Sequence, residues 1–424
     1  MLDRNLIRKD PEFVRAQCRR KGVEPPVDEF LAVDAEFRQT KVQADEKKAA
    51  MNRISKSIGS LMAQGDRDAA EAAKQEAATL KTDVQALESR EKELEARLEE
   101  IELLFPNLPH ESVPDGKTEA DNVVVRDWQA KPEREPVPHW EICERLGLAD
   151  FERATKITGS GFVVYTGAGA RLVRALINFM LTHQTTQNGY REVWPPAMVN
   201  AASLVGTGNL PKFEEDLYKT RDDFYMIPTA EVPVTNLYRD EILDIGQLPI
   251  KLAAYTPCFR REAGAAGRDT RGVLRTHQFD KVELVHFVTP ETSYDALESL
   301  TKDAEDILQL LGLHYRVLLL CTGDMGEKGS KTYDLEVWSP GVERYLEVSS
   351  CTNFEAYQAR RARVRMRREK GGPTEPLHIL NGSGLAVPRL LSALLETYYR
   401  AAENVVSIPT PLVPFFGAER ITAE

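Results

Sequence analysis

The residues with the most evident chemistry lie in two strand-like stretches that are close together in the chain. Residues 252–262 (LAAYTPCFRRE) and 276–288 (THQFDKVELVHFV) are rich in β-branched, aromatic and other apolar residues. The thirteen residues between them, 263–275, contain Gly264, Gly267, Gly272, Arg268, Arg271 and Arg275. This pattern predicts a β-hairpin with a long cationic loop.

One face of this hairpin combines cations, acids and an aromatic ring. Because side chains alternate along a strand, Arg260 and Glu262 are expected on one face, and Phe279, Lys281 and Glu283 on one face of the partner strand. A guanidinium binds phosphate oxygens in pairs, an aromatic ring stacks on a base, and a carboxylate accepts from an exocyclic amine. The pattern favours a nucleotide site, with an ordinary ion-paired hairpin as the structural alternative.

Two further stretches could complete such a site. The sequence Asn381–Arg389 (NGSGLAVPR) precedes an amphipathic stretch at 390–396, so its glycines let the backbone approach a ligand and Arg389 can meet a phosphate. Taken alone, this motif is explained equally well by an ordinary glycine turn that binds no ligand. The sequence 189–196 (GYREVWPP) follows a helical stretch at about 171–187 and suits an association element as well as a site.

Motifs of other nucleotide and metal sites are absent from the sequence. The stretch from Gly326 has Lys331 where a phosphate-binding loop needs glycine, and Leu172 and Val387 stand where dinucleotide fingerprints need their third glycine. The seven histidines and five cysteines form no H-E-x-x-H or C-x-x-C motif, so no zinc is expected. Any metal should accompany phosphates.

The elements that position these motifs belong to a large folded chain. Its 424 residues, 42% of them hydrophobic, suffice for at least one large core. The net charge of −11 argues against a protein that coats nucleic acid indiscriminately, so no DNA partner is expected. The charged amino terminus, the odd number of cysteines and the absence of a long apolar run predict a cytoplasmic protein without a membrane partner.

Residues from about 28 to 105 have the composition of long helices, with no proline between Pro26 and Pro106. The sequence Gln64-Gly-Asp66 offers a stop, a turn and an N-cap, so two antiparallel helices are expected. Apolar residues recur there with the spacing of a heptad seam. These residues are Met51, Ile54, Ile58, Leu61, Ala73, Ala77, Leu80, Val84, Leu87, Leu94, Leu98, Ile101 and Phe105.

Two positively charged segments each have two possible interpretations. Residues 40–60 of the arm carry a net charge of +3, which fits either solvated coiled-coil faces or a surface that binds a polyanion. Residues 360–370 hold seven cations, which fit either a solvated or ion-paired surface or a surface that guides a nucleic acid into the site. A proline-rich stretch at about 104–138 predicts a domain boundary near residue 110, followed by an α+β domain with a mostly antiparallel sheet.

In this order the three stretches resemble motifs 1, 2 and 3 of class II aminoacyl-tRNA synthetases, and most closely those of the seryl-tRNA synthetase family. Pro196, Arg260-Arg-Glu262 and Arg389 stand at the defining positions. The resemblance covers nearly the whole chain, and it also rests on MLDRNLIRKDPEFV, the arm, Thr229-Ala-Glu231 and Glu347-Val-Ser-Ser350. It implies an antiparallel β-sheet core flanked by helices, with a long α-helical coiled-coil arm at the N-terminus.

The resemblance also implies the domains. Residues 1–110 would bind tRNA through the arm at about 28–105, and residues 111–424 would form the catalytic domain. Motif 1 would span about 171–196, motif 2 about 252–288 and motif 3 about 381–400.

By resemblance, the nucleotide residues bind ATP. Arg260 would hold the α-phosphate, Glu262 the adenine amino group and Phe279 the ring, with Thr276 touching adenine through its backbone. Arg275 and Arg389 would clamp the outer phosphates, and Arg260 and Arg389 are the catalytic residues. Glu347 and Ser350 would help to hold Mg²⁺, with Val348 and Ser349 on the same wall. Arg261 joins the ATP set as the middle of R-x-E, although alternation points it to the opposite face.

Serine is the substrate that the resemblance implies. Thr229, Ala230, Glu231 and Glu283 would grip it, with Ser383 closing around the side chain. A small hydroxyl-bearing substrate must be distinguished from alanine by buried polar partners that alanine would leave unpaired. The residues leave open which acid binds the ammonium group and which the hydroxyl.

The implied function is that of a serine-tRNA ligase, which forms seryl-adenylate and charges tRNA(Ser) and tRNA(Sec) as a homodimer. One alternative is an amino acid ligase that loads a carrier protein, against which the arm argues. The other is a non-enzymatic coiled-coil scaffold that binds RNA, against which the intact set of charged residues argues.

Overall fold

The computed structural model describes residues 1–133, 135–262 and 271–423. The chain divides into two compact units. One contains residues 2–19 and 23–106, and the other contains Met1, residues 20–22 and residues 107–424. Among the described residues, no helix has the length and apolar character needed to cross a membrane.

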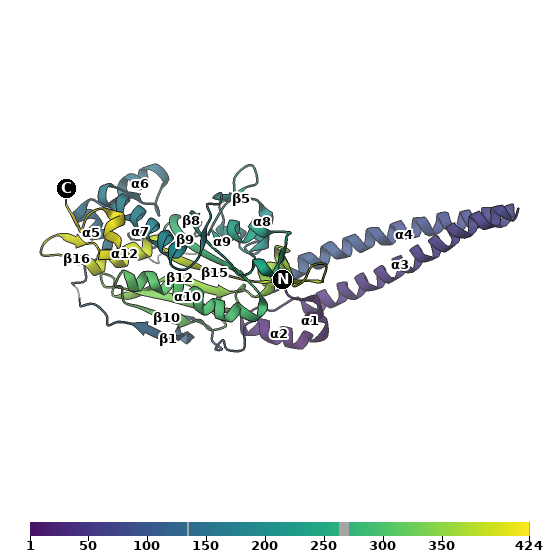
Figure 1. The fold of residues 1–424 in the computed structure, drawn as a ribbon, viewed down its shortest axis with the longest axis horizontal. Coiled ribbons are helices and arrows are strands. Elements are labelled where there is room, and N and C mark those ends of the chain that lie inside the picture. Colours follow the sequence, from purple (N-terminus) through teal and green to yellow (C-terminus); the bar gives the residue numbers. More distant parts are fainter. Residues whose placement is uncertain (134, 263–270, 424) are drawn as a thin grey trace. The chain divides into compact units, whose positions relative to one another are not determined.

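The first unit is helical. Its elements are α1 (Arg4–Lys9), α2 (Pro11–Arg20), α3 (Val27–Ala63) and α4 (Arg67–Glu102). The helices α3 and α4 lie side by side and run in opposite directions (Figure 1). Gly65 turns the chain with a φ of 79°, and the Asp66 side chain caps α4 by accepting a hydrogen bond from the backbone N–H of Ala69 at 3.1 Å. The predicted antiparallel coiled-coil arm is confirmed.

The arm is held by its seam and by ion pairs across it. Val84, Leu94 and Leu98 of the predicted seam are buried. Three of the cations in residues 40–60 pair with acids of α4: Lys41 with Glu91, Lys47 with Asp83 and Lys48 with Glu88. Part of the positive charge of α3 therefore stabilises the hairpin itself.

The second unit is built on an eight-stranded sheet. Its strand order is β1 (Val123–Trp128), β10 (Tyr315–Leu319), β11 (Lys331–Ser339), β12 (Arg344–Asn353), β15 (His378–Ala386), β9 (Gln278–Val288), β8 (Ile250–Phe259) and β4 (Arg191–Glu192). All neighbours are antiparallel except β4 and β8. The predicted α+β fold with a mostly antiparallel sheet is confirmed.

Three long helices pack on this sheet (Figure 1). They are α7 (Gly167–Thr186), α10 (Ser293–Leu310) and α12 (Val387–Tyr398). Their apolar faces and the sheet share one large core. The remaining elements are α5 (His139–Leu146), β2 (Ala149–Asp150), α6 (Phe151–Thr158), β3 (Val164–Tyr165), β5 (Met198–Val199), α8 (Ala201–Gly206), β6 (Tyr225–Met226), α9 (Glu231–Thr235), β7 (Ile242–Asp244), α11 (Ala356–Arg361), β13 (Arg365–Arg367), β14 (Thr374–Pro376), β16 (Tyr399–Arg400), β17 (Val405–Ser407), α13 (Val413–Phe416) and β18 (Arg420–Thr422).

The predicted hairpin is the pair β8 and β9, in which Cys258 faces Phe279 and Ala254 faces Glu283. The strand predicted for residues 252–262 ends at Phe259, earlier than expected. Glu262 has a φ of 51°, in the left-handed region, so the chain has left the extended conformation there. Of the predicted cationic loop, Gly264, Gly267 and Arg268 lie outside the described residues.

Candidate active site

A pocket lies where β8 ends, β9 begins and α12 begins, against β12. Nine of the residues predicted to bind substrates line it: Arg260, Glu262, Arg275, Thr276, Phe279, Glu347, Val348, Ser383 and Arg389. We call it the first pocket. It brings together residues from motifs 2 and 3, which are remote in the chain.

Arg260 lies directly after β8 and is held from two sides. Its backbone N–H donates to the carbonyl of His277 at 2.9 Å, and its Nε donates to the carbonyl of Pro228 at 3.4 Å. The guanidinium carbon lies 5.1 Å from the centroid of the Phe279 ring, within the range of a cation–π contact. The arginine and the ring therefore form one wall of the pocket.

Glu262 and Arg275 close another side of the pocket. A nitrogen of the Arg275 guanidinium lies 2.6 Å from Glu262 Oε2. The left-handed backbone of Glu262, and not strand alternation, brings its carboxylate to the same pocket as Arg260. Of the face predicted by alternation, Arg260, Glu262, Phe279 and Lys281 line the first pocket, whereas the buried Glu283 does not.

Arg389 reaches the first pocket from the first turn of α12. Its Nη1 donates to the backbone carbonyl of Glu347 at 2.7 Å and lies 3.7 Å from Glu347 Oε2. Gly382, on the strand that leads to this helix, is required by packing, because a Cβ there would lie 2.7 Å from Cys351 Sγ. Arg260 and Arg389 thus place two guanidinium groups on one pocket.

A second pocket adjoins the first and shares Arg260, Glu262 and Arg275 with it. Thr229 and Glu231, both predicted to bind serine, line this second pocket. Ala230 lies between them in the chain and is fully buried.

Glu283 lies beneath these residues with 3% of its surface exposed. Its Oε2 is 2.5 Å from Lys281 Nζ and accepts a hydrogen bond from Thr229 Oγ1 at 3.3 Å. Lys281 Nζ also donates to Thr229 Oγ1 at 2.8 Å. Burial raises the pKa of Glu283, and the Lys281 ammonium opposes this by lowering it.

The side chains of residues 347–350 in β12 lie in different environments, some buried and some in pockets. Ser349 is buried, and its Oγ donates to the carbonyl of Ser383 at 2.6 Å. Glu347 and Ser350 line a third pocket, where Ser350 faces Asp334 in the ladder between β11 and β12.

The oxygen donors of this third pocket fit Mg²⁺. Asp334 Oδ1 is buried and has no hydrogen-bond partner among the described residues. Within the described ranges, no three His, Cys, Asp or Glu side chains are grouped to hold a metal ion. A partial set of carboxylate and hydroxyl oxygens suits an ion that keeps phosphate oxygens among its ligands.

Two predicted cationic features lie away from the first pocket. Arg261 donates from Nη1 to the carbonyl of Glu215 at 3.1 Å and lines neither the first nor the second pocket. In the basic run 360–370, Arg361 is buried, Arg363 pairs with Asp240, and Arg368 pairs with Glu291 and with Glu375. Much of that run is therefore engaged within the protein.

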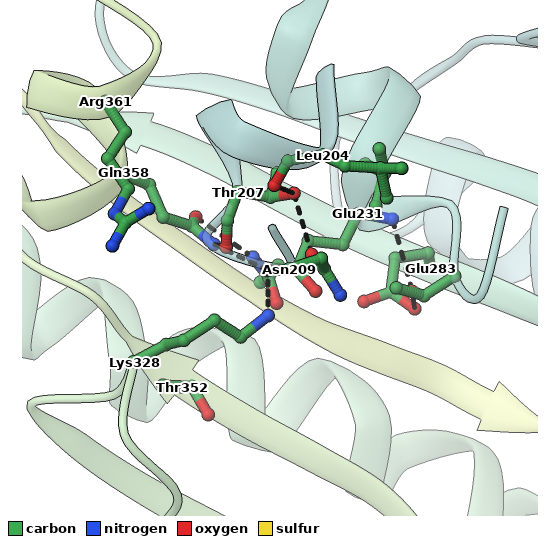
Figure 2. A network of polar contacts seen from close by, with 12 residues as sticks. Leu204, Thr207, Asn209, Glu231, Glu283, Lys328, Thr352, Gln358 and Arg361 are labelled. Carbon is green, nitrogen blue, oxygen red and sulfur yellow. Dashed lines mark hydrogen bonds and ion pairs between the residues drawn. The ribbon is translucent and has the colours of Figure 1, made fainter. Parts of the chain in front are cut away.

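Three polar residues around Glu231 and Glu283 were not among the residues predicted to bind substrates. Lys281 pairs with Glu283, and its position two residues earlier on the same strand was a usable signal. Gln358 and Lys328 both contact Glu231 (Figure 2). Gln358 belongs to α11 and Lys328 to the segment between β10 and β11. No local sequence pattern predicts that either residue contacts Glu231.

The antiparallel sheet and the pocket walled by arginines are those of a class II aminoacyl-tRNA synthetase. The family model described as the tRNA synthetase class II core domain (G, H, P, S and T) matches residues 212–398, and the model of the seryl-tRNA synthetase N-terminal domain matches residues 1–109. Curated relatives named serine–tRNA ligase include those of Desulforamulus reducens, 54% identical over 100% of both chains, and Bacillus subtilis, 52% identical over 99% of both. The chain belongs to the seryl-tRNA synthetase family.

Solved structures agree with this placement. The seryl-tRNA synthetase of Pyrococcus horikoshii complexed with ATP has a TM-score of 0.91 and 34% identity, with 100% of both chains covered. The cytoplasmic serine–tRNA ligase of Naegleria fowleri in complex with AMP has a TM-score of 0.88 and 27% identity, covering 100% of this chain and 99% of that one.

Proposed function

We propose that this protein is a serine-tRNA ligase. It activates L-serine with ATP to form seryl-adenylate and pyrophosphate, and then transfers serine to the 3′ end of tRNA(Ser). The observation that carries the proposal is the convergence of Arg260 and Arg389 on one pocket, which shares a wall with a second pocket lined by Thr229 and Glu231. Full-length similarity to curated serine–tRNA ligases supports the choice of substrate.

ATP would occupy the first pocket. Phe279 stacks on the adenine ring, Glu262 accepts from its amino group, and the backbone of Thr276 meets its edge. Arg260 holds the α-phosphate, and Arg275 and Arg389 hold the outer phosphates. Arg275 pairs with Glu262 through Oε2, which leaves Glu262 Oε1 to accept from the adenine amino group and other Arg275 N–H groups to meet phosphates.

Mg²⁺ would be held by Glu347 and Ser350 together with the phosphates, and it supplies charge neutralisation there. Val348 lines the first pocket, whereas Ser349 is buried, so an ATP contact of Ser349 stays a prediction. An ATP-binding role for Arg261 is a prediction that depends only on its place in R-x-E.

Serine would occupy the second pocket, with Thr229, Ala230, Glu231, Glu283 and Ser383 around it. Its carboxylate attacks the α-phosphorus in line while pyrophosphate departs, so charge builds on the equatorial and leaving oxygens. Fixed guanidinium groups stabilise this charge without reorganisation. No side-chain nucleophile is required, and the proposal assigns no general base.

The tRNA partner would dock on the arm formed by α3 and α4. In residues 40–60, Arg53 and Lys56 belong to the cations that could meet phosphates. We also propose that the protein charges tRNA(Sec), forms a homodimer and is located in the cytoplasm.

Serine-dependent exchange of pyrophosphate into ATP tests the proposal directly. Wild-type protein should catalyse the exchange with serine, and Arg260→Ala should lose it while retaining its fold by circular dichroism. Arg400→Ala serves as a matched control because Arg400 lies on the surface and pairs with Glu403. Wild-type exchange in Arg260→Ala would remove this assignment, and loading of a carrier protein in place of tRNA would favour the alternative ligase.

A further inference from the structure

A buried lysine holds the segment that connects β10 to β11. Lys21, with 8% of its surface exposed, donates from Nζ to the carbonyls of Gly326 at 3.0 Å, Glu327 at 3.1 Å and Gly329 at 2.5 Å. A buried ammonium is costly unless it is fully hydrogen-bonded, and three carbonyls around one nitrogen leave the segment little freedom. Residues 326–329 are therefore fixed in place.

Lys328 lies within this fixed segment, and its side chain is held at both ends. Its Nζ lies 3.4 Å from Glu231 Oε1. Its aliphatic part passes over Gly208, where a Cβ would come within 3.1 Å of Lys328 Cδ. Gly208 also has a φ of 77°, so a side chain there is disfavoured for a second reason.

Among the described residues, side chains hold the Glu231 carboxylate through Oε1. Gln358 Nε2 donates to Oε1 at 2.5 Å, and Lys328 Nζ approaches the same oxygen (Figure 2). In the part of the chain that the structure describes, Oε2 accepts no hydrogen bond from a side chain. Glu231 lines the second pocket beside Thr229 and Arg260, so Oε2 is the oxygen left for a donor on a ligand.

We propose that Lys328 is a positioning residue for the amino acid substrate and that Lys21 sets its place. Together with Gln358, Lys328 fixes Glu231 so that Oε2 receives a hydrogen bond from serine, from either its ammonium group or its hydroxyl. The inference depends on the proposed function and adds to it a cation that lines the second pocket but not the first.

The test is the pair of Michaelis constants in serine-dependent pyrophosphate exchange. Lys328→Gln removes the charge, and because a charge-assisted contact with the buried Glu231 carboxylate is lost, the KM for serine should rise about tenfold, which is about 1.4 kcal/mol. The KM for ATP should stay within about twofold. Lys212→Gln is the matched control, since Lys212 pairs with the side chain of Glu327 in the same segment and lines neither the first nor the second pocket.

A second variant pair tests Lys21. Lys21→Met should raise the KM for serine, and Lys21→Arg, which can still donate to the carbonyls, should restore it. If Lys21→Met does not fold, the result of Lys328→Gln decides alone. A KM for serine within twofold of wild type in Lys328→Gln, or equal rises in both constants, would overturn the inference. Failure of wild-type protein to exchange pyrophosphate with serine would instead remove the proposed function itself.

Discussion

Replacing Lys281 with methionine should leave a buried carboxylate without its cation. Methionine keeps most of the side-chain volume but removes the ammonium group that lies 2.5 Å from Glu283 Oε2. Breaking a buried ion pair from one side costs about 3–5 kcal/mol. Since Thr229 Oγ1 still donates to the same oxygen, we expect the lower end of this range, about 3 kcal/mol.

The pH dependence of this loss has a defined sign. Burial raises the pKa of Glu283 above its ordinary value of 4.5 and Lys281 opposes the rise, so Lys281→Met should raise the pKa further. A carboxyl group whose pKa is higher in the folded state binds more protons when folded. The stability deficit of the variant should therefore shrink as the pH is lowered from 7 towards 5.

Urea unfolding followed by tryptophan fluorescence measures this deficit. All four tryptophans, Trp128, Trp140, Trp194 and Trp338, lie in the second unit, so the signal reports the unit that contains the pair. The double variant Lys281→Met/Glu283→Gln removes both charges and should regain most of the lost free energy. The reasoning is refuted if the double variant is as unstable as the single one, or if the deficit is equal at pH 5 and pH 7.

Two other predictions concern the first unit. The buried Asp34 accepts from Arg8 and Arg38, which outweigh the effect of burial and lower its pKa, so its contribution to stability should be present above about pH 4 and lost on further acidification. Asp34→Asn should lower the thermal stability of the helices by circular dichroism at pH 7 and should lower it less at pH 3; equal losses at both pH values would contradict this. Replacing residues 40–95 with a short glycine-serine linker should spare pyrophosphate exchange and severely weaken tRNA charging. Normal charging by that variant would give the arm another role.

The parts of the fold that depend on local spacing were predicted well. The seam that includes Val84, Leu94 and Leu98 repeats at coiled-coil intervals, and the turn at Gly65 has its own cap, so both helices of the arm could be derived from neighbouring residues alone. The order of the sheet could not, because β15 enters between β12 and β9 from a later part of the chain.

In the candidate site, too, only the contacts between residues of one hairpin could be predicted from local spacing. Cys258 faces Phe279 in the hairpin, so alternation predicts that Arg260 lies on the same face as Phe279. Their meeting with Arg389 was expected only from the resemblance to a family. Glu262 joined them through a left-handed residue that no strand pattern contains. Lys328 could not be foreseen, because its position depends on Lys21, some three hundred residues earlier.

The common wall of Arg260, Glu262 and Arg275 has a consequence for inhibitor design. Because the two pockets adjoin and share three lining residues, one compound with an adenosine-like end and a serine-like end could bind in both, and its second end would bind as an intramolecular event. A stable neutral linker in place of the phosphate would lie beside the shared arginines, so the gain in affinity would come from the joined ends and not from added charge.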